Sequence, residues 1–282
     1  MKNNTFTFLF ALLFGCQLFA QDETMRILQS DRARFLNDTL FVQGSKARLM
    51  IIPFEPIMFR TQIGQEIGAA SGVNYDQLST NFRRGLDNVL FIETDRKFSV
   101  VRMIVEEPEI KKDLYAIYGA SRHEYRALPK PTAKKKRMRL GKNPPNAGTS
   151  SPPHTSGRIE KGQVISEPFK GNRFMARGIR DKGLFDHLYD KYETILYLFI
   201  NQLEIRPMEA LDYRAYEGGE YQREILVHYS IYSDGFEIFS GVAVRGFSSS
   251  VNDQKQIILE NFPALAAEIV AKLPVVHLAG SK

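Results

Sequence analysis

A nearly continuous apolar run, RLMIIPF at residues 48–54, is the stretch from which the fold can be worked out. It is bounded by charge on one side and by Pro56 on the other. Strands of a parallel sheet have this composition when helices cover both of their faces. The run therefore predicts a strand buried on both faces, near the start of an α/β fold.

The segment that follows this strand contains glycines at positions 64, 68 and 72 and is expected to form a loop. Asn74, with Gln77 three residues later, has the pattern of a helix N-cap. Apolar residues then recur at helical spacing through residues 75–90, which predicts a helix with one apolar face. A strand at residues 97–104 and a shorter helix from Pro108 to Gly119 are expected next.

The second half predicts a helix at residues 184–192 and then a long strand at 195–205. Two β-rich runs, 223–232 and 236–247, are joined by Ser-Asp-Gly, a strong hairpin signal. A closing helix at 253–272 contains Pro263, which is expected to kink or split it. This order predicts an α/β fold in which parallel strand–helix units and an antiparallel C-terminal hairpin share a mixed sheet, packed with four to five helices.

The N-terminus has the parts of an export signal. A lysine at position 2 precedes an apolar run at residues 6–14 and small or weakly polar residues up to Ala20. About nine apolar residues are too few to cross roughly 30 Å of hydrocarbon as a permanent helix. We therefore expect an exported protein that works in the periplasm or at the outer membrane of a bacterial cell.

Two processing routes are open. Cleavage after Ala20 removes a signal peptide of residues 1–20, whereas LFGC at residues 13–16 is similar to a bacterial lipobox. By the second route the leader is residues 1–15 and Cys16 carries the lipid. Cys16 is the single cysteine, so the mature body has no disulfide and no pair of thiol ligands.

A basic, proline-rich insert at residues 129–161 separates residues 21–128 from residues 162–282. It holds nine basic residues and one acidic residue, a net charge of +8, whereas the whole chain carries +6, so the remainder carries −2. The insert has almost no large apolar side chain to offset the entropy of ordering. We expect it to be disordered, with the two flanking segments as the halves of an α/β domain.

The charge of the insert is densest in a five-residue basic set. These residues are candidates for contact with anionic lipid head groups or acidic polymers of the envelope, whereas a solvated linker that its charge keeps extended is the alternative. Nucleic acid is not expected, because aromatic residues for base stacking are missing from the run and export removes most nucleic acid from reach. The set is Lys134, Lys135, Lys136, Arg137 and Arg139.

Known catalytic signatures are missing from the sequence. It contains no Gly-x-Ser-x-Gly elbow, no phosphate-binding loop and no Rossmann glycine triplet. Residues 123–127, HEYRA, begin like a zinc-protease helix, but Ala127 stands where the second histidine would be. We therefore predict no cofactor and no metal site.

Three polar residues of the second half are candidates for a shared site. Counting with a period of two, and assuming that the strands are neighbours, Glu204, His228 and Arg245 are expected close together on one sheet face, with Arg245 on the face of Glu237. A carboxylate, an imidazole and a guanidinium form an acid/base or anion-binding group. The alternative is a solvated or partner-facing surface with cross-strand charge pairs.

Two further positions are candidates for binding. Glu55 follows the first buried strand, and α/β sheets tend to place ligand-contacting groups at that end of a strand. The segment 207–221 carries Tyr213, Tyr216 and Tyr221 beside two glycines, a composition common in binding surfaces. An ordinary solvated carboxylate and an ordinary mobile connection are the respective alternatives.

Residues 49–55, the helix after them and the strand at Phe98 resemble the opening of a group of bacterial envelope proteins. The group includes the curli-secretion lipoprotein, the penicillin-binding-protein activator lipoproteins and the N-terminal domain of the translocation protein TolB. The hairpin at Asp234-Gly235 and the closing helix are similar to their pattern too. The chain departs from it in its long basic insert, and it lacks an obvious amphipathic hairpin pair of the kind that builds a secretion pore.

We expect a non-catalytic accessory or assembly factor that binds other envelope proteins or cell-wall polymer through its sheet edge or its tyrosine segment. One alternative is an envelope hydrolase without a recognisable motif, which would use Glu204, His228 and Arg245, or Glu55. The other is a polyanion-binding module that acts through the basic insert.

Overall fold

The computed structural model describes residues 33–36, 39–43, 47–127, 158–160, 163–165, 173–208 and 221–279. The chain divides into two compact units. The larger, called the main unit below, consists of residues 1–124 and 175–282, and the smaller consists of residues 125–174. The two halves of the sequence therefore contribute to the same core in the main unit.

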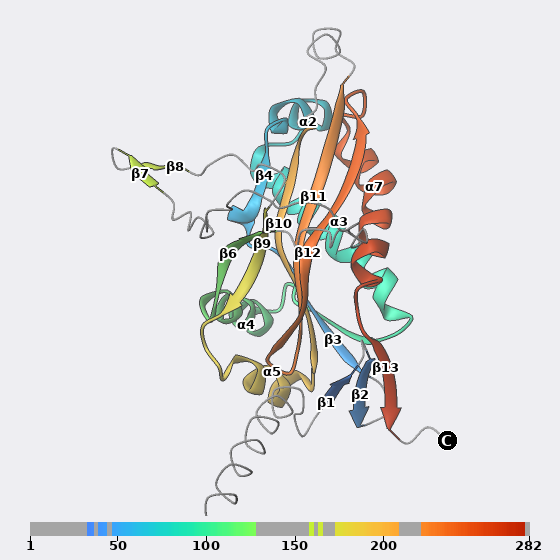
Figure 1. The fold of residues 1–282 in the computed structure, drawn as a ribbon. Coiled ribbons are helices and arrows are strands. Elements are labelled where there is room, and N and C mark those ends of the chain that lie inside the picture. Colours follow the sequence, from blue (N-terminus) through green and yellow to red (C-terminus); the bar gives the residue numbers. More distant parts are fainter. Residues whose placement is uncertain are drawn as a thin grey trace, which may run out of the picture. The chain divides into compact units, whose positions relative to one another are not determined.

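A mixed sheet forms the centre of the main unit (Figure 1). β10 is parallel to β3 and β3 is parallel to β5, whereas β10, β11 and β12 are antiparallel neighbours. The predicted α/β class with parallel units and an antiparallel hairpin is confirmed. In spatial order the strands are β12 (Phe236–Ser248), β11 (Gln222–Ser233), β10 (Leu196–Pro207), β3 (Arg48–Ile52) and β5 (Ser99–Arg102), and β4 (Phe59–Thr61) pairs with the end of β10.

The hairpin between β11 and β12 forms where the sequence predicts it. Asp234 and Gly235 both have positive φ, 43° and 89°. Two-residue turns of this kind match the twist of the strands that they join, and they favour the Asp-Gly dipeptide because glycine adopts positive φ without strain.

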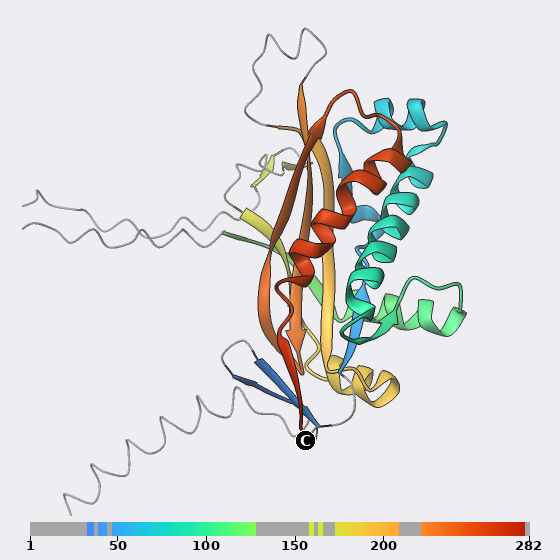
Figure 2. The same ribbon diagram turned by 90° about the vertical axis from the view of Figure 1, so that its right-hand side faces the viewer.

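Five α-helices lie within the described residues, and α3 and α7 cover one face of the sheet, called the first face (Figure 2). Asn74 caps α3 reciprocally with Gln77, as predicted. On β3, Leu49 and Ile51 point into this layer. The helices are α2 (Gly64–Ser71), α3 (Tyr75–Asp95), α4 (Pro108–Gly119), α5 (Leu184–Tyr192) and α7 (Gln254–Val270).

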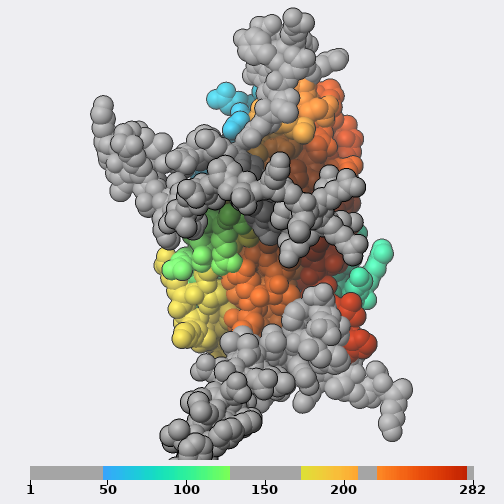
Figure 3. Space-filling model, in the orientation of Figure 1, coloured from blue at the N-terminus to red at the C-terminus, as the bar shows by residue number. Residues whose placement is uncertain are grey.

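The opposite face of the sheet, called the second face, packs against α4 and α5. Here Met50 and Ile52 of β3 join a separate apolar cluster with Phe199 and Tyr232. β6 (Ser121–Ala127) pairs with β9 (Arg173–Ile179), and side chains of the second face bond to the backbone of β9. In the space-filling view the described atoms around β9 adjoin those of β11 and β12 (Figure 3).

One helix prediction needs correction, and for a second the structure excludes one of its two alternatives. The expected loop with glycines 64, 68 and 72 contains α2, whose Ile67 is fully buried. Gly68 packs so closely that a Cβ there would lie 2.8 Å from the carbonyl oxygen of Val73, so this glycine permits a close approach inside a helix. Pro263 lies inside α7, which continues through it as one element, so the proline does not split the helix.

The remaining described elements are short. β2 (Thr39–Gln43) lies between β1 (Ala33–Leu36), which is antiparallel to it, and β13 (Val275–Ala279), which is parallel to it. A 3-10 helix, η1 (Pro56–Met58), follows β3. β7 (Arg158–Glu160) and β8 (Gln163–Ile165) form an antiparallel pair in the smaller unit. No described helix has the length and apolar composition needed to span a membrane.

Candidate functional site

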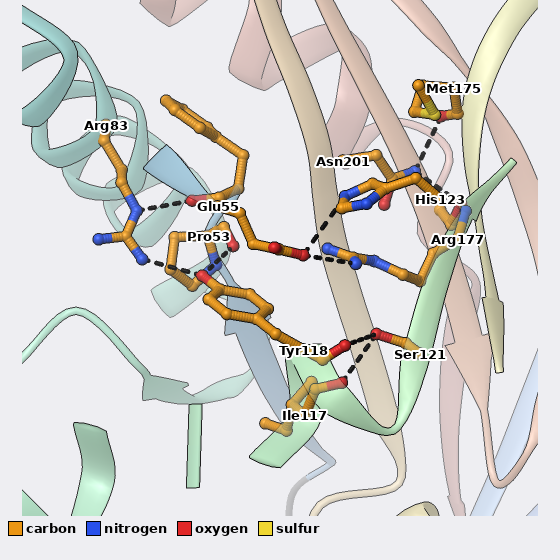
Figure 4. A network of polar contacts seen from close by, with 12 residues as sticks. Pro53, Glu55, Arg83, Ile117, Tyr118, Ser121, His123, Met175, Arg177 and Asn201 are labelled. Atoms are coloured by element: carbon orange, nitrogen blue, oxygen red, sulfur yellow. Dashed lines mark hydrogen bonds and ion pairs between the residues drawn. The ribbon is translucent and has the colours of Figure 1, made fainter. Parts of the chain in front are cut away.

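Glu55 lies just beyond the carboxyl end of β3, where the sequence places a candidate ligand-binding group. Its side chain is 25% exposed, and its Oε1 accepts a hydrogen bond from Nη1 of Arg177 at 3.0 Å (Figure 4). Arg177 belongs to β9, 122 residues further along the chain. The carboxylate of Glu55 is therefore committed to a contact within the protein.

Arg177 is a cation with no exposed surface. Its guanidinium lies over the rings of Tyr118 and Phe199, with the central carbon 5.7 and 5.9 Å from the ring centroids. Burial lowers the pKa of Arg177, and the Glu55 carboxylate opposes that change. Within the described residues, its Nε and Nη2 atoms are buried without a hydrogen-bond partner. Glu55 is thus the anion on which the buried charge depends.

His123, on β6, approaches the same carboxylate but does not form an ion pair with it at neutral pH. Its Nε2 lies 3.5 Å from Oε1 of Glu55. Burial, followed by the positive charge of Arg177, lowers the pKa of His123 to about 4, although Glu55 acts in the opposite direction. The imidazole is therefore neutral at pH 7. Residues 123–127 belong to the strand β6, so they do not form the helix on which the zinc-protease pattern is found.

Tyr118 and Arg83 hold the backbone that precedes Glu55. Arg83 donates from Nε to the carbonyl oxygen of Phe54 at 2.7 Å and from Nη2 to the Tyr118 hydroxyl at 2.9 Å. That hydroxyl donates to the carbonyl oxygen of Pro53 at 2.7 Å, and burial raises the pKa of Tyr118 to about 12. These contacts tie α3 and α4 to the end of β3, which indicates a structural role for the network.

A second polar group lies on the second face of the sheet, where a β-bulge at Asn201 changes the phase of β10. Asn201 donates to the carbonyl oxygen of Met175 at 3.0 Å and to the Ser230 hydroxyl at 2.9 Å. That hydroxyl in turn accepts the backbone N–H of Arg177 at 3.1 Å. Side chains of the sheet thus satisfy backbone groups of β9, which lies across the face.

His228 takes part in this arrangement as an acceptor. Its Nδ1 accepts the backbone N–H of Met175 at 3.0 Å, and the side chain has no exposed surface. Burial, reinforced by the charge of Arg206, lowers its pKa to about 3. A neutral imidazole that bonds to the backbone and is out of reach of solvent does not have the access that a general acid or base requires.

Glu204 and His228 lie on the same face, as the period-two counting predicts. Glu204 pairs with Leu226, two residues along the strands from the pair Gln202–His228. The guanidinium near Glu204 comes from Arg206, whose Nη1 lies 3.7 Å from Glu204 and whose Nη2 lies 2.8 Å from Glu224. The sequence signal for Arg206 was available, because it continues the alternation of Gln202 and Glu204 along β10.

Arg245 does not join this group, which corrects the prediction. It pairs with Ile225, whose side chain faces the helices, so Arg245 lies on the first face. The register of β12 shifts between the partners of Ile231 and Tyr232, and this shift places Arg245 and Glu237 on opposite faces of the sheet. Glu237 accepts from the Tyr232 hydroxyl at 3.0 Å and lies on the second face. A bulge inserts one extra residue into the strand, so a count with a period of two assigns the residues beyond it to the wrong face.

Tyr221 directly precedes β11 and lies beside another buried arginine. The Arg223 side chain, 1% exposed, bonds to the Tyr221 hydroxyl, to Asn252 and to Glu66 of α2. The remaining sequence candidates lie outside the described residues: Tyr213, Tyr216, Lys134, Lys135, Lys136, Arg137, Arg139 and the lipidation candidate Cys16.

A pocket among the described residues, near the end of β3, is smaller than an ordinary ligand site. This pocket, lined by Pro53, Phe54, Arg83 and Asp87, among others, has an empty volume of about 160 Å³, whereas ligand pockets occupy about 300–1,000 Å³. No group of three or more histidine, cysteine or acidic residues that could hold a metal occurs in this part of the chain.

Comparison with known proteins identifies no family for this chain. No family model, no curated protein sequence and no solved structure matches the chain.

Proposed function

We propose that this chain is an exported protein of the bacterial cell envelope that acts without catalysis, as an accessory or assembly factor for other envelope proteins. The sequence pattern of an export signal in residues 1–20, or 1–15 by the lipobox route, supports the location. The order of elements that resembles envelope proteins of the curli-secretion, penicillin-binding-protein activator and TolB type supports the class of partner.

One observation carries the proposal for binding rather than catalysis. His228, the imidazole of the candidate acid/base group, is fully buried and accepts the backbone N–H of Met175 at 3.0 Å. The second candidate carboxylate, Glu55, holds a buried guanidinium. Because both candidate groups bond to other parts of the protein, they are not free to act on a substrate. This favours a scaffold that binds its partner through the surface of the sheet.

Export and binding are tested together in the native host. The wild-type chain, a chain without residues 1–20 and a Glu204→Gln variant are expressed with a C-terminal tag. The mature mass is measured, and partners are captured after chemical cross-linking. We expect the leader to be absent from the mature wild type, and one defined envelope protein to be enriched by wild type and Glu204→Gln but not by the leaderless chain.

Two results would contradict the proposal. An intact polypeptide with Met1 in the cytosolic fraction would remove export. Turnover of an envelope substrate that disappears in Glu204→Gln would support the alternative of a hydrolase, because this substitution keeps the shape of the side chain and removes its charge.

A further inference from the structure

β12 forms a long edge of the main sheet. It spans 13 residues, and its hydrogen-bonded neighbour among the described strands is β11. The strand at the other end of the sheet, β5, spans four residues. An edge strand presents a row of backbone N–H and C=O groups that can pair with another chain. β12 is therefore the edge with room for a long added strand.

The sequence of β12, FEIFSGVAVRGFS, carries little of the usual protection of an edge between Phe239 and Ser248. It contains no proline and no lysine, which natural edges use to prevent pairing. Its bulge lies near Glu237, and the register from Phe239 to Ser248 runs without interruption. Ten successive residues can thus accept a partner strand in regular geometry.

Side chains on the two faces of this edge differ in chemistry. Val242 and Val244 pair with His228 and Leu226, so both lie on the second face, and Val244 is 44% exposed. Arg245 lies on the first face and is exposed, and none of the described residues forms an ion pair with it. An added strand would meet apolar surface on one side and an open positive charge on the other.

We propose that the edge of β12 binds an extended segment of a partner envelope protein by antiparallel strand addition. The segment places an acidic side chain opposite Arg245 and β-branched apolar side chains opposite Val244 and Val242. In an antiparallel strand these positions read Glu-Val-x-Val from N- to C-terminus. Backbone hydrogen bonds supply affinity, and the alternating side chains supply specificity. This inference rests on the proposed function and names the chemistry of its partner.

A second copy of this chain does not fit the same edge. Directly opposed residues of antiparallel strands point to the same face. The acidic residue of β12 is Glu237, which lies on the second face and bonds to Tyr232, whereas Arg245 lies on the first. Self-pairing would leave Arg245 without a carboxylate, so charge complementarity favours a foreign strand.

The test uses the mature chain and a fluorescent peptide, Thr-Thr-Glu-Val-Thr-Val-Thr-Thr, with binding followed by anisotropy. One control peptide carries Lys in place of Glu, and another has the reversed order. We expect the Glu peptide to bind about tenfold more tightly than the Lys peptide, because an opposite-charge pair replaces a like-charge pair. Arg245→Glu is expected to reverse this preference. Val244→Lys is expected to weaken binding of both peptides, whereas Leu259→Lys, at an exposed position of α7, is a matched control.

Circular dichroism and thermal unfolding establish that each variant is folded, and Arg245→Glu remains the deciding variant if Val244→Lys does not fold. Equal binding of the two peptides, or an unchanged preference in Arg245→Glu, would overturn the inference. Sedimentation that shows a dimer abolished by Val244→Lys would identify a second copy as the occupant instead. If Val244→Lys and Arg245→Glu captured an envelope partner at wild-type levels, the inference about β12 would be wrong, whereas the proposed function would still hold.

Discussion

The carboxylate of Glu55 accepts a hydrogen bond at 3.0 Å from the fully buried guanidinium of Arg177. Glu55 follows β3 in the first half of the chain, and Arg177 lies on β9, beyond the insert. The contact therefore joins the two halves of the sequence across the second face of the sheet. Through this contact, Arg177 occupies the candidate ligand-binding position at the end of β3.

Removing one charge of this pair should destabilise the fold more than removing both. Glu55→Gln leaves the buried Arg177 without its anion, and breaking a buried pair in this way costs about 3–5 kcal/mol. We expect the lower end of that range, because Glu55 keeps 25% of its side chain exposed. Adding Arg177→Met should recover part of the loss. Urea unfolding of the two single variants and the double variant measures the coupling.

The control for this cycle is the exposed pair of Arg48 and Glu193, 3.2 Å apart. Glu193→Gln should cost less than about 1 kcal/mol, since Glu193 is 72% exposed. If Glu55→Gln cost no more than this control, the buried pair would not be the clamp between the halves.

The buried histidine should make the protein sensitive to acid. The pKa of His228 is lowered from 6.5 to about 3 in the fold, so the unfolded chain takes up the proton first. Its contribution to stability is complete above about pH 6.5 and is lost as the pH falls towards 3, by up to about 1.4 kcal/mol per pH unit. His228→Asn, which keeps an acceptor for Met175, should reduce this slope between about pH 6 and pH 4.

Urea midpoints measured across that pH range provide the comparison, with the exposed His187→Asn as the control expected to retain the wild-type slope. A wild-type slope in His228→Asn would show that this imidazole is not the buried neutral group that the fold requires.

Hydrogen exchange of the β9 amides should report on the bonds that side chains of the second face form with the backbone of β9. Asn201→Ala removes the donor to the carbonyl oxygen of Met175 and to Ser230, which accepts the Arg177 amide. We expect the Met175 and Arg177 amides to exchange about tenfold faster, the scale of one lost buried hydrogen bond. Amides of α7 should not change. Gln202→Ala, one residue away, is the control, and equal effects of the two variants would argue against the specific contact.

The sequence-based prediction succeeds where hydrophobic periodicity and local capping determine the element. Residues 48–54 and 75–90 carry their own signals, because β3 is buried on both faces and the apolar side of α3 recurs at helical spacing. The Asp234-Gly235 turn is equally local. None of these features depends on a distant part of the chain.

The site was less accessible to prediction, because it depends on long-range placement. β9, RFMARGI, is held by the side chains of other strands, and its own alternation does not reveal Arg177 as the partner of Glu55. The bulges in β10 and β12 decide the faces of Asn201 and Arg245, and nothing in the alternation of the strands marks them. His228 was identified as a candidate, but its role as a backbone acceptor requires β9 to be in place.

The basic insert gives a separate prediction for the polyanion alternative. If the charge of residues 129–161 governs binding to acidic polymers, deleting the insert should abolish retention on a heparin column at low salt. The wild type should elute as the salt concentration rises. Replacing Lys134, Lys135 and Lys136 with Gln is the milder control. Unchanged retention of the deleted chain would exclude the insert as the polyanion-binding segment.

Site-specific photo-cross-linking in living cells tests most directly the claim that the edge of β12 binds a partner envelope protein. A photoreactive amino acid replaces Val244 on the edge or Leu259 on α7, both exposed in the fold. We expect one defined adduct with an envelope protein from position 244, none from position 259, and loss of the adduct when Arg245→Glu is added. The absence of an adduct at position 244, or equal adducts from both positions, would contradict the claim.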